Sequence, residues 1–255
     1  MIKPGVCSVT FRNKSPKEII ELTACAGLCA IEWGSDVHVR EGDSEKAKEV
    51  RKMTESAGLE VSSYGSYFRL GSNQDFTPFL ESAAALGTDE IRIWAGASAS
   101  AYYLFDARCA IVREAKEISR KAAEYGITIS TECHANTLTD TPESLLLFMN
   151  EVNESNFCTY WQELLHIPEN EQMRFLYATY ASGKLTNIHI QHYKNFETTR
   201  EQRPLIEAYN TWHERLSILK DDKNTRYALL EFVQNGSEES FLKDAYGLKM
   251  ILDAL

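Results

Sequence analysis

The residues best suited to chemistry lie in one short stretch, from Ile127 to Ser144, with the sequence ITISTECHANTLTDTPES. If Ile127 to Thr131 forms a strand, alternation places Glu132 and His134 on the same face as Ser130. A carboxylate and an imidazole at one strand end can hold a metal ion or transfer a proton. The pattern also fits a polar loop between a strand and a helix.

The elements that must position these residues recur regularly along the chain. Short apolar or alternating runs predict strands at 6–11, 30–34, 59–64, 90–95, 127–132, 157–162, 185–190 and 226–233. Amphipathic stretches predict helices at 15–27, 43–57, 76–86, 106–125, 142–152, 169–181, 204–219 and 237–254. Serine or proline begins several of these helices, and a glycine such as Gly87 or Gly126 follows several of them.

Strand–helix units in this order favour an α/β fold, a (β/α)8 TIM barrel formed as a single domain by residues 1–255. A doubly wound open sheet is the alternative fold. It is disfavoured because no Gly-x-Gly-x-x-Gly turn follows the first expected strand.

Active sites of such barrels lie at the carboxyl ends of the strands. Polar and aromatic side chains gather at the expected ends: Glu32, Trp33, His38, Tyr64, Ser66, Arg92, Trp94, Glu132, His134, Asn136, Trp161, Gln162, His189, Gln191, His192 and Glu231. Barrel closure would bring Glu132, His189 and Glu231 toward one axial pocket. Two carboxylates and an imidazole suit a divalent cation such as Mn²⁺, Mg²⁺, Co²⁺ or Zn²⁺. Taken singly, each could instead be a buried histidine with satisfied hydrogen bonds or an ion-pair partner of Arg92.

Two glutamates beside a cation can perform proton transfer at carbon. The cation polarises a carbonyl oxygen, so that one carboxylate removes a proton from the neighbouring carbon and the other returns it on the opposite face. We therefore predict Glu132 and Glu231 as the catalytic pair of an epimerase or isomerase. An aldose–ketose isomerisation would need proton transfer between adjacent carbons or a metal-assisted hydride shift.

The remaining strand-end residues are predicted to contact the substrate. Aromatic rings can cover the C–H face of a sugar, and polar groups can hydrogen-bond its hydroxyls or a phosphate. The predicted contacts are His38, Tyr64, Arg92, Trp94, His134, Asn136, Trp161 and Gln191. Arg92 has two interpretations, as a substrate anchor or as a charge partner of the glutamates.

Composition excludes several classes of function. The formal net charge of −10 disfavours nucleic acid as a partner, because its phosphates would meet an acidic protein. The chain has no apolar run long enough to span a membrane, so we expect no membrane partner. We expect a cytoplasmic protein. Its six cysteines lack the spacing of a zinc ribbon or a disulfide framework.

Several segments together resemble the sugar phosphate isomerase/epimerase group of the xylose isomerase-like barrels. They are the opening GVCSVTFRNKSPKEIIELTACAGLCAIEWGSDVHV, then IRIWAG, TECHANTLTDTPES, YWQ, NIHIQHY and ALLEFVQNGSEESFLKDA. In the epimerase branch, a fifth-strand glutamate, a sixth-strand aspartate, a seventh-strand histidine and an eighth-strand glutamate hold the metal. The resemblance places Glu132, His189 and Glu231 at matching positions, and it places Gln162 where the aspartate would stand. An amide oxygen can ligate a hard cation but adds no charge.

The resemblance implies a metal-dependent isomerase or epimerase of a small sugar, sugar acid or sugar phosphate. A dehydratase of a polyol or keto-inositol is an alternative, because the same chemistry can expel a β-hydroxyl. A barrel that binds carbohydrate without catalysis is another, in which Gln162 marks a lost metal site. Endonuclease IV relatives are disfavoured because Arg92 and Trp94 stand where a further histidine ligand is wanted. Barrels of this group often associate, so a homo-oligomer is compatible with the resemblance.

Overall fold

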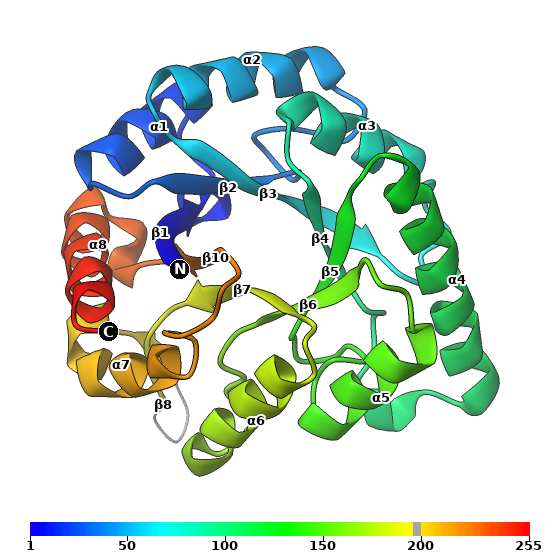
Figure 1. The fold of residues 1–255 in the computed structure, drawn as a ribbon. Helices are drawn as coiled ribbons and strands as arrows, with labels where there is room; N and C mark the ends of the chain where they lie inside the picture. The colour runs from blue at the N-terminus through cyan, green and yellow to red at the C-terminus, as the bar shows by residue number, and fades with distance from the viewer. Residues whose placement is uncertain (196–199) are drawn as a thin grey trace.

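Eight parallel strands form a closed barrel in the computed structural model, which describes residues 1–195 and 200–255. The barrel strands are β1 (Ile2–Cys7), β2 (Ala30–Gly34), β3 (Glu60–Arg69), β4 (Glu90–Trp94), β5 (Thr128–Glu132), β6 (Phe157–Trp161), β7 (Leu185–Ile190) and β10 (Arg226–Leu230). Their order around the barrel follows the chain, and β10 closes it by pairing in parallel with β1. The predicted (β/α)8 TIM barrel is confirmed (Figure 1).

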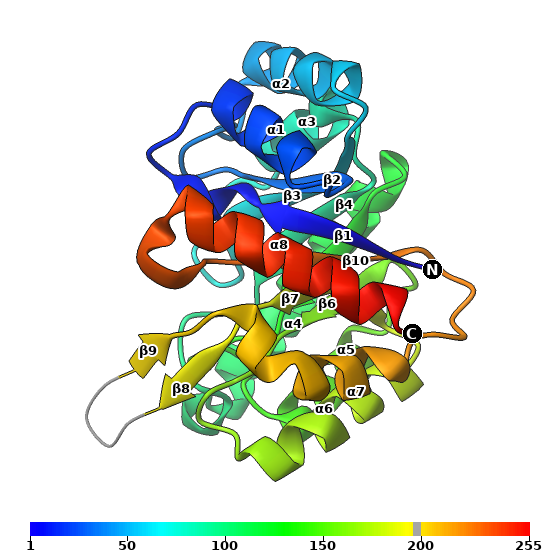
Figure 2. The same ribbon diagram turned by 90° about the vertical axis from the view of Figure 1, so that its left-hand side faces the viewer.

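Helices cover the outside of this barrel (Figures 1 and 2). They are α1 (Pro16–Cys25), α2 (Ser44–Ser56), α3 (Thr77–Leu86), α4 (Phe105–Glu124), α5 (Pro142–Val152), α6 (Glu169–Ala181), α7 (Tyr209–Ser217) and α8 (Glu238–Asp253). Short 3-10 turns are η1 (Ser8–Phe11), η2 (Ser100–Tyr102), η3 (Leu205–Ala208) and η4 (Gln234–Gly236). No described helix is long and apolar enough to cross a membrane.

Local sequence explains where the helices begin and end. Ser15 accepts from the backbone of Glu18 while the Glu18 carboxylate accepts from the Ser15 backbone, a reciprocal cap at the start of α1. Thr141 caps α5 in front of a proline at the first helical turn. Gly87 follows α3 with a φ of 75°, a left-handed conformation that glycine adopts without a steric penalty.

The first predicted strand, 6–11, was placed too late. β1 starts at Ile2, and Ser8–Phe11 form the turn η1, with Phe11 packed edge-on against Phe241 of α8. Pro4 and Gly5 are residue types that usually interrupt strands. The Pro4 carbonyl nevertheless accepts from the Cys29 backbone N–H, and this bond does not require an N–H on proline. The last predicted strand, 226–233, ends early at Leu230, which leaves Glu231 at the mouth of the barrel.

Other boundaries also differ from the prediction. β3 continues to Arg69 rather than ending at Tyr64, and the predicted helix 204–219 consists of η3 followed by α7. An antiparallel hairpin of β8 (Tyr193–Asn195) and β9 (Arg200–Gln202) was not predicted. It projects beyond the carboxyl end of β7 (Figure 2).

Candidate metal centre and active-site pocket

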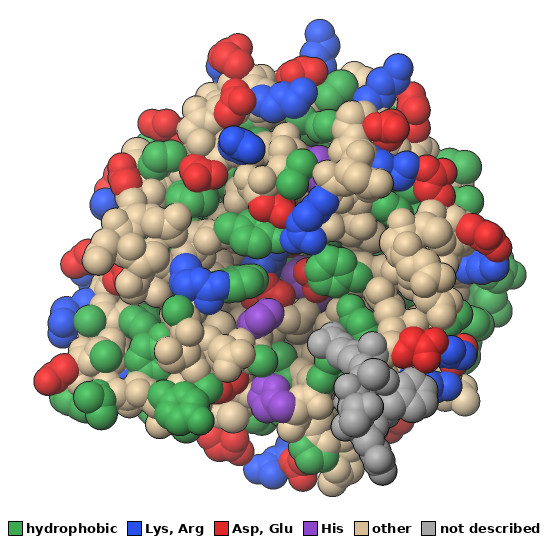
Figure 3. Space-filling model, turned by 180° about the vertical axis from the view of Figure 1, so that it is seen from behind, with side chains coloured by type: hydrophobic (Ala, Val, Ile, Leu, Met, Phe, Trp, Pro, Cys, Tyr) green, Lys and Arg blue, Asp and Glu red, His purple; other side chains and the backbone are tan. Residues whose placement is uncertain are grey.

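A pocket of about 580 Å³ lies at the carboxyl ends of the strands. Its wall combines Glu132, Gln162 and Glu231 with aromatic and basic side chains from other strand ends. Figure 3 shows this hollow from outside, with acidic and histidine side chains inside it. This is the end of the barrel at which the active site was expected.

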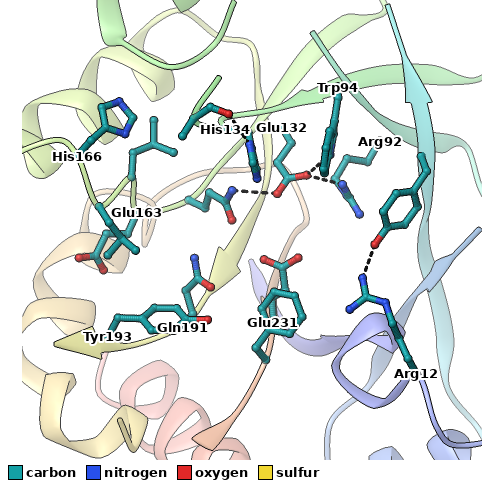
Figure 4. Close-up of a pocket in the computed structure, with 16 residues that line it drawn as sticks. Arg12, Arg92, Trp94, Glu132, His134, Glu163, His166, Gln191, Tyr193 and Glu231 are labelled. Atoms are coloured by element: carbon teal, nitrogen blue, oxygen red, sulfur yellow. Dashed lines mark hydrogen bonds and ion pairs between the residues drawn. The ribbon is translucent and has the colours of Figure 1, made fainter. Parts of the chain in front are cut away.

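Glu132 and Glu231 line this pocket, and the buried His189 lies between them. His189 Nδ1 lies 3.6 Å from Glu132 Oε1 and 3.4 Å from Glu231 Oε2. One donor atom from each of the three side chains lies within 4.8 Å of the others, and all three residues are buried. Figure 4 shows the two carboxylates facing each other from β5 and from the end of β10. The structure thus brings together three residues from strands far apart in sequence.

Glu132 is held in place by three neighbours. Trp94 Nε1 donates to Glu132 Oε2 at 2.8 Å, and Gln162 Nε2 donates to Oε1 at 2.9 Å. Arg92 pairs with Oε2 as well. Burial opposes ionisation of Glu132, but Arg92 and His189 outweigh it and hold its pKa well below the ordinary value. Glu132 is therefore an ionised, fixed carboxylate.

Arg92 joins Glu132 to a second buried carboxylate, Glu32. Arg92 Nε lies 2.9 Å from Glu32 Oε1, and both side chains are at most 3% exposed. Ser63 donates to the other oxygen of Glu32 at 2.9 Å. Burial alone would raise the pKa of Glu32, but the opposing effect of Arg92 and His189 is larger and lowers the pKa to about 2. In this structure Arg92 acts as the charge partner of the glutamates, the second of its two interpretations.

The charges around His189 do not balance. Three carboxylates, those of Glu32, Glu132 and Glu231, surround His189, and Arg92 is the one guanidinium that contacts this group among the described residues. Burial lowers the pKa of His189, but Cys7, Glu231 and Glu32 outweigh it and raise the pKa well above the ordinary value. A cation bound among these carboxylates would take the place of the proton on His189, because an imidazole that ligates a metal is neutral.

Unpartnered polar atoms at the same place fit a metal ion. His189 Nδ1, the ring nitrogen that faces Glu132 and Glu231, and Gln162 Oε1 are both buried without a hydrogen-bond partner. Buried polar atoms normally have a partner, so these two atoms are candidate ligands of a bound ion. Imidazole nitrogen with carboxylate and amide oxygens is a donor set suited to Mg²⁺, Mn²⁺ or Zn²⁺. Glu132, His189, Glu231 and Gln162 would hold such an ion.

Backbone strain occurs next to this group. Phe232 has a φ of 59°, which is unusual for a bulky side chain. Thr10 Oγ1 accepts its backbone N–H at 3.0 Å and so helps to hold this conformation. Strain of this kind is tolerated where surrounding contacts fix it, and it turns the chain directly after Glu231.

Other predicted substrate contacts also line the pocket. His134 stacks on Trp94 with ring centroids 4.7 Å apart, and its Nδ1 lies 2.7 Å from the Ala135 carbonyl. The Arg69 guanidinium lies 3.9 Å from the Trp94 ring centroid. Gln191 lies at the pocket wall opposite this stack (Figure 4).

Four predicted substrate contacts lie away from the pocket. His38 bonds to Ser8 Oγ at 3.0 Å, and Tyr64 donates to the Val39 carbonyl at 2.8 Å. Trp161 is fully buried between the barrel and α7, because strand alternation turns it outward while Gln162 faces the pocket. Asn136 is exposed and does not line the pocket.

Sequence reasoning missed several members of the site. Glu32 was placed at a strand end without a predicted role, whereas its partner Arg92 was predicted to contact the substrate or the glutamates. Arg12 and Tyr67 line the pocket and bond to each other, with Arg12 also paired to Asp36. Misplaced ends of the first and third strands hid these two residues. Glu163, also missed, lines the opposite wall from the loop after β6 (Figure 4). His166 of the same loop, which the sequence offers either as a substitute metal ligand for Gln162 or as a residue at the start of a helix, lines this wall and is not in the group of Glu132, His189 and Glu231.

Comparison with known proteins connects this geometry to a family. The sequence pattern of the xylose isomerase-like TIM barrel family matches residues 20–245. A 3-dehydroshikimate dehydratase of Bacillus anthracis is 26% identical over 168 residues, which are 61% of this chain and 59% of the relative. The match thus spans about three fifths of that curated relative.

Solved structures share the whole fold at lower identity. A probable 3-DHS dehydratase of Bacillus anthracis, described as involved in petrobactin synthesis, superposes with a TM-score of 0.83 and 20% identity, covering 98% of this chain and 99% of that one. A D-allulose 3-epimerase from Methylomonas sp. in complex with D-allulose gives a TM-score of 0.74 and 16% identity, covering 99% and 96%. At these identities the similarity concerns the fold.

Proposed function

This chain belongs to the xylose isomerase-like TIM barrel family, and on that premise we propose that it is a metal-dependent dehydratase of a small polyhydroxylated carbonyl compound. The observation that carries this proposal is the buried group of Glu132, His189 and Glu231, in which Glu132 is fixed by three neighbours and Glu231 faces the pocket. Sequence similarity to a dehydratase supports the same reaction class.

Elimination of water requires one base and one acid. A bound divalent cation would polarise the substrate carbonyl and so acidify the neighbouring C–H bond. Glu231 then removes that proton, a carbon–carbon double bond forms, and the β-hydroxyl departs. His134 in its imidazolium form supplies the proton that converts the departing hydroxyl to water, because its Nδ1–H donates to the Ala135 carbonyl and its Nε2–H remains for the substrate.

The restraint on Glu132 favours dehydration over epimerisation. An epimerase needs a second base that returns a proton to carbon, whereas Glu132 is bonded to Arg92, Trp94 and Gln162 and its pKa is held low. Epimerisation remains the second candidate, because Glu132 and Glu231 flank His189 as a two-base reaction would need. The fold similarity to a D-allulose 3-epimerase is compatible with it.

Product mass separates these reactions. We propose incubating the Mn²⁺-loaded protein with 3-dehydroshikimate, D-allulose and D-fructose in H₂O and in D₂O. Dehydration predicts a product lighter by one water, whereas epimerisation predicts an unchanged mass in H₂O with solvent deuterium on carbon in D₂O. Glu231→Gln should abolish turnover, and Glu239→Gln, an exposed residue on α8, should retain it. Label incorporation without water loss would reject the dehydratase in favour of the epimerase.

A binding protein without catalysis predicts a different result. Protein purified without chelator would then contain less than about 0.1 metal ion per chain, and added Mn²⁺ would not raise its melting temperature. The dehydratase predicts stabilisation by Mn²⁺, because a ligand that binds only the folded state shifts the unfolding equilibrium.

A further inference from the structure

A buried arginine on α7 lies directly behind the pocket wall. Arg215 is 2% exposed, and its Nη1 lies 3.1 Å from Glu163 Oε2 while its Nη2 lies 2.8 Å from Glu169 Oε1. Its guanidinium lies 5.6 Å from the ring centroid of Trp161 and 5.0 Å from that of Trp212. Two carboxylates and two indole rings therefore surround one cation.

This arrangement fixes the guanidinium strongly. A buried charge is costly unless it is paired, and arginine can bond to two carboxylates while its planar faces contact aromatic rings. Trp161 and Trp212 are fully buried, with ring centroids 6.1 Å apart. The two rings therefore support the Arg215 guanidinium rigidly. Glu163 and Glu169 pair with a cation whose position is fixed.

The carboxylates belong to the segment that forms one side of the pocket. Residues 163–168 connect β6 to α6, and Glu163 and His166 of this segment line the pocket. Glu169 begins α6 at the other end of the segment. Arg215 thus binds both ends of the loop from behind.

The same helix also holds the neighbouring strand end. Trp212 Nε1 donates to the Gln191 carbonyl at 3.1 Å, and Gln191 lines the pocket directly after β7. One turn of α7 therefore contacts two adjacent parts of the wall, on the side opposite Arg12 (Figure 4).

We infer that Arg215, supported by Trp161 and Trp212, is a positioning residue that holds the 163–168 wall of the pocket in its substrate-binding conformation. It acts through Glu163 and does not touch the metal ligands Glu132, His189 and Glu231. Loss of Arg215 should therefore weaken substrate binding more than it slows the chemical step. The kinetic part of this inference rests on the proposed function, and the structural part does not.

The test compares Arg215→Met with Glu169→Gln in the Mn²⁺-loaded protein. Arg215→Met removes both ion pairs, whereas Glu169→Gln weakens only the outer pair, whose carboxylate side chain is 65% exposed. With 3-dehydroshikimate we expect Arg215→Met to raise KM about 10-fold or more with kcat within about 2-fold, as for lost substrate binding. Glu169→Gln should keep a near wild-type KM, and Mn²⁺ affinity should stay within about 2-fold in both variants.

Hydrogen–deuterium exchange of the same proteins provides a readout that needs no substrate. Arg215→Met should speed exchange of the backbone amides in 163–168 while leaving β5 and β7 protected. If Arg215→Met is too unstable to purify, Arg215→Lys replaces it, because lysine keeps the charge but loses the planar fork.

The inference is overturned if exchange in 163–168 stays at the wild-type rate, or if kcat falls while KM stays constant. Faster exchange in this segment, together with no turnover of any compound by the wild-type protein, would reject the proposed function and support the inference. The two failures are therefore distinguishable.

Discussion

The state of a single carboxylate, Glu132, sets the chemistry available to this pocket. Its oxygens are shared among Arg92, Trp94 and Gln162, and Arg92 in turn pairs with Glu32. A carboxylate restrained in this way suits metal binding better than proton transfer. Glu231 contacts His189 at 3.4 Å and faces the pocket, so it is the better base.

Replacing Arg92 tests this division of roles. Arg92→Met leaves two buried carboxylates without their cation, and we expect the metal-free protein to lose about 3–5 kcal/mol of unfolding free energy. Urea denaturation measures the loss. Arg51→Met on α2 is the matched control, because its partner Glu55 is 56% exposed and the pair is worth little. An Arg92→Met protein as stable as this control would show that the buried pair does not matter.

At the scale of elements, the absence of a side chain at one strand position matters as much to the site as the polar side chains at the others. Gly65 of β3 faces the Glu32–Arg92 pair, and a Cβ there would lie 2.7 Å from Glu32 Oε1 and 3.0 Å from Arg92 Nη2. Because Glu32 and Arg92 approach the backbone so closely here, only glycine fits at this position.

A methyl group at Gly65 should displace this pair. We expect Gly65→Ala to lower the unfolding free energy by about 1–3 kcal/mol and to weaken Mn²⁺ binding about 10-fold through the shifted Glu132. Gly247→Ala on α8 is the control, since its nearest neighbours would lie 3.7 Å from the added Cβ. Helix propensity predicts that this control is at least as stable as wild type. Calorimetric titration and urea denaturation check both variants, and wild-type behaviour of Gly65→Ala would contradict the packing argument.

Periodicity predicted most of this architecture because each element has a local signal. Caps at Ser15 and Thr141 and the glycines after helices mark element ends in the sequence itself. The metal group was predicted because barrel closure alone brings Glu132, His189 and Glu231 together. Trp161 and Tyr64, predicted as substrate contacts, do not line the pocket. Whether a strand-end side chain faces the pocket or the helices depends on one residue of register.

Arg92 was predicted, in one of its two interpretations, as a charge partner of Glu132 and Glu231, but two other long-range ion pairs were not predicted. Arg92 pairs with Glu32 across 60 residues, and Arg215 pairs with Glu163 across 52, and neither pair leaves a spacing pattern in the sequence. The hairpin of β8 and β9 was missed because its strands have only three residues each.

At the scale of the whole molecule, the barrel carries buried acids at both ends. Glu90 lies at the start of β4, far from the pocket end, and accepts from Ser130 at 2.5 Å and Asn187 at 2.7 Å. Burial raises its pKa from 4.5 to about 7, although the bond from Ser130 opposes this. The folded protein therefore binds a proton between these pH values that the unfolded chain releases.

This proton uptake predicts that stability falls as pH rises through that window. Below pH 4.5 Glu90 contributes up to about 3 kcal/mol to the unfolding free energy. This contribution is lost by about pH 7. Glu90→Gln should remove this part of the pH dependence, as measured by urea denaturation at about pH 5 and about pH 8. Asp244, whose pKa burial raises to about 6, leaves a smaller trend of the same sign in both proteins. An equal slope in wild type and Glu90→Gln would refute the assignment.

Calorimetric titration of Mn²⁺ into metal-free protein tests the central claim most directly. The account predicts one ion per chain for wild type, at least about 100-fold weaker binding for Glu231→Ala, and near wild-type affinity for Glu163→Gln, a pocket carboxylate outside the ligand group. Equal Mn²⁺ binding by wild type and Glu231→Ala, or no binding by wild type, would contradict a metal centre at Glu132, His189 and Glu231.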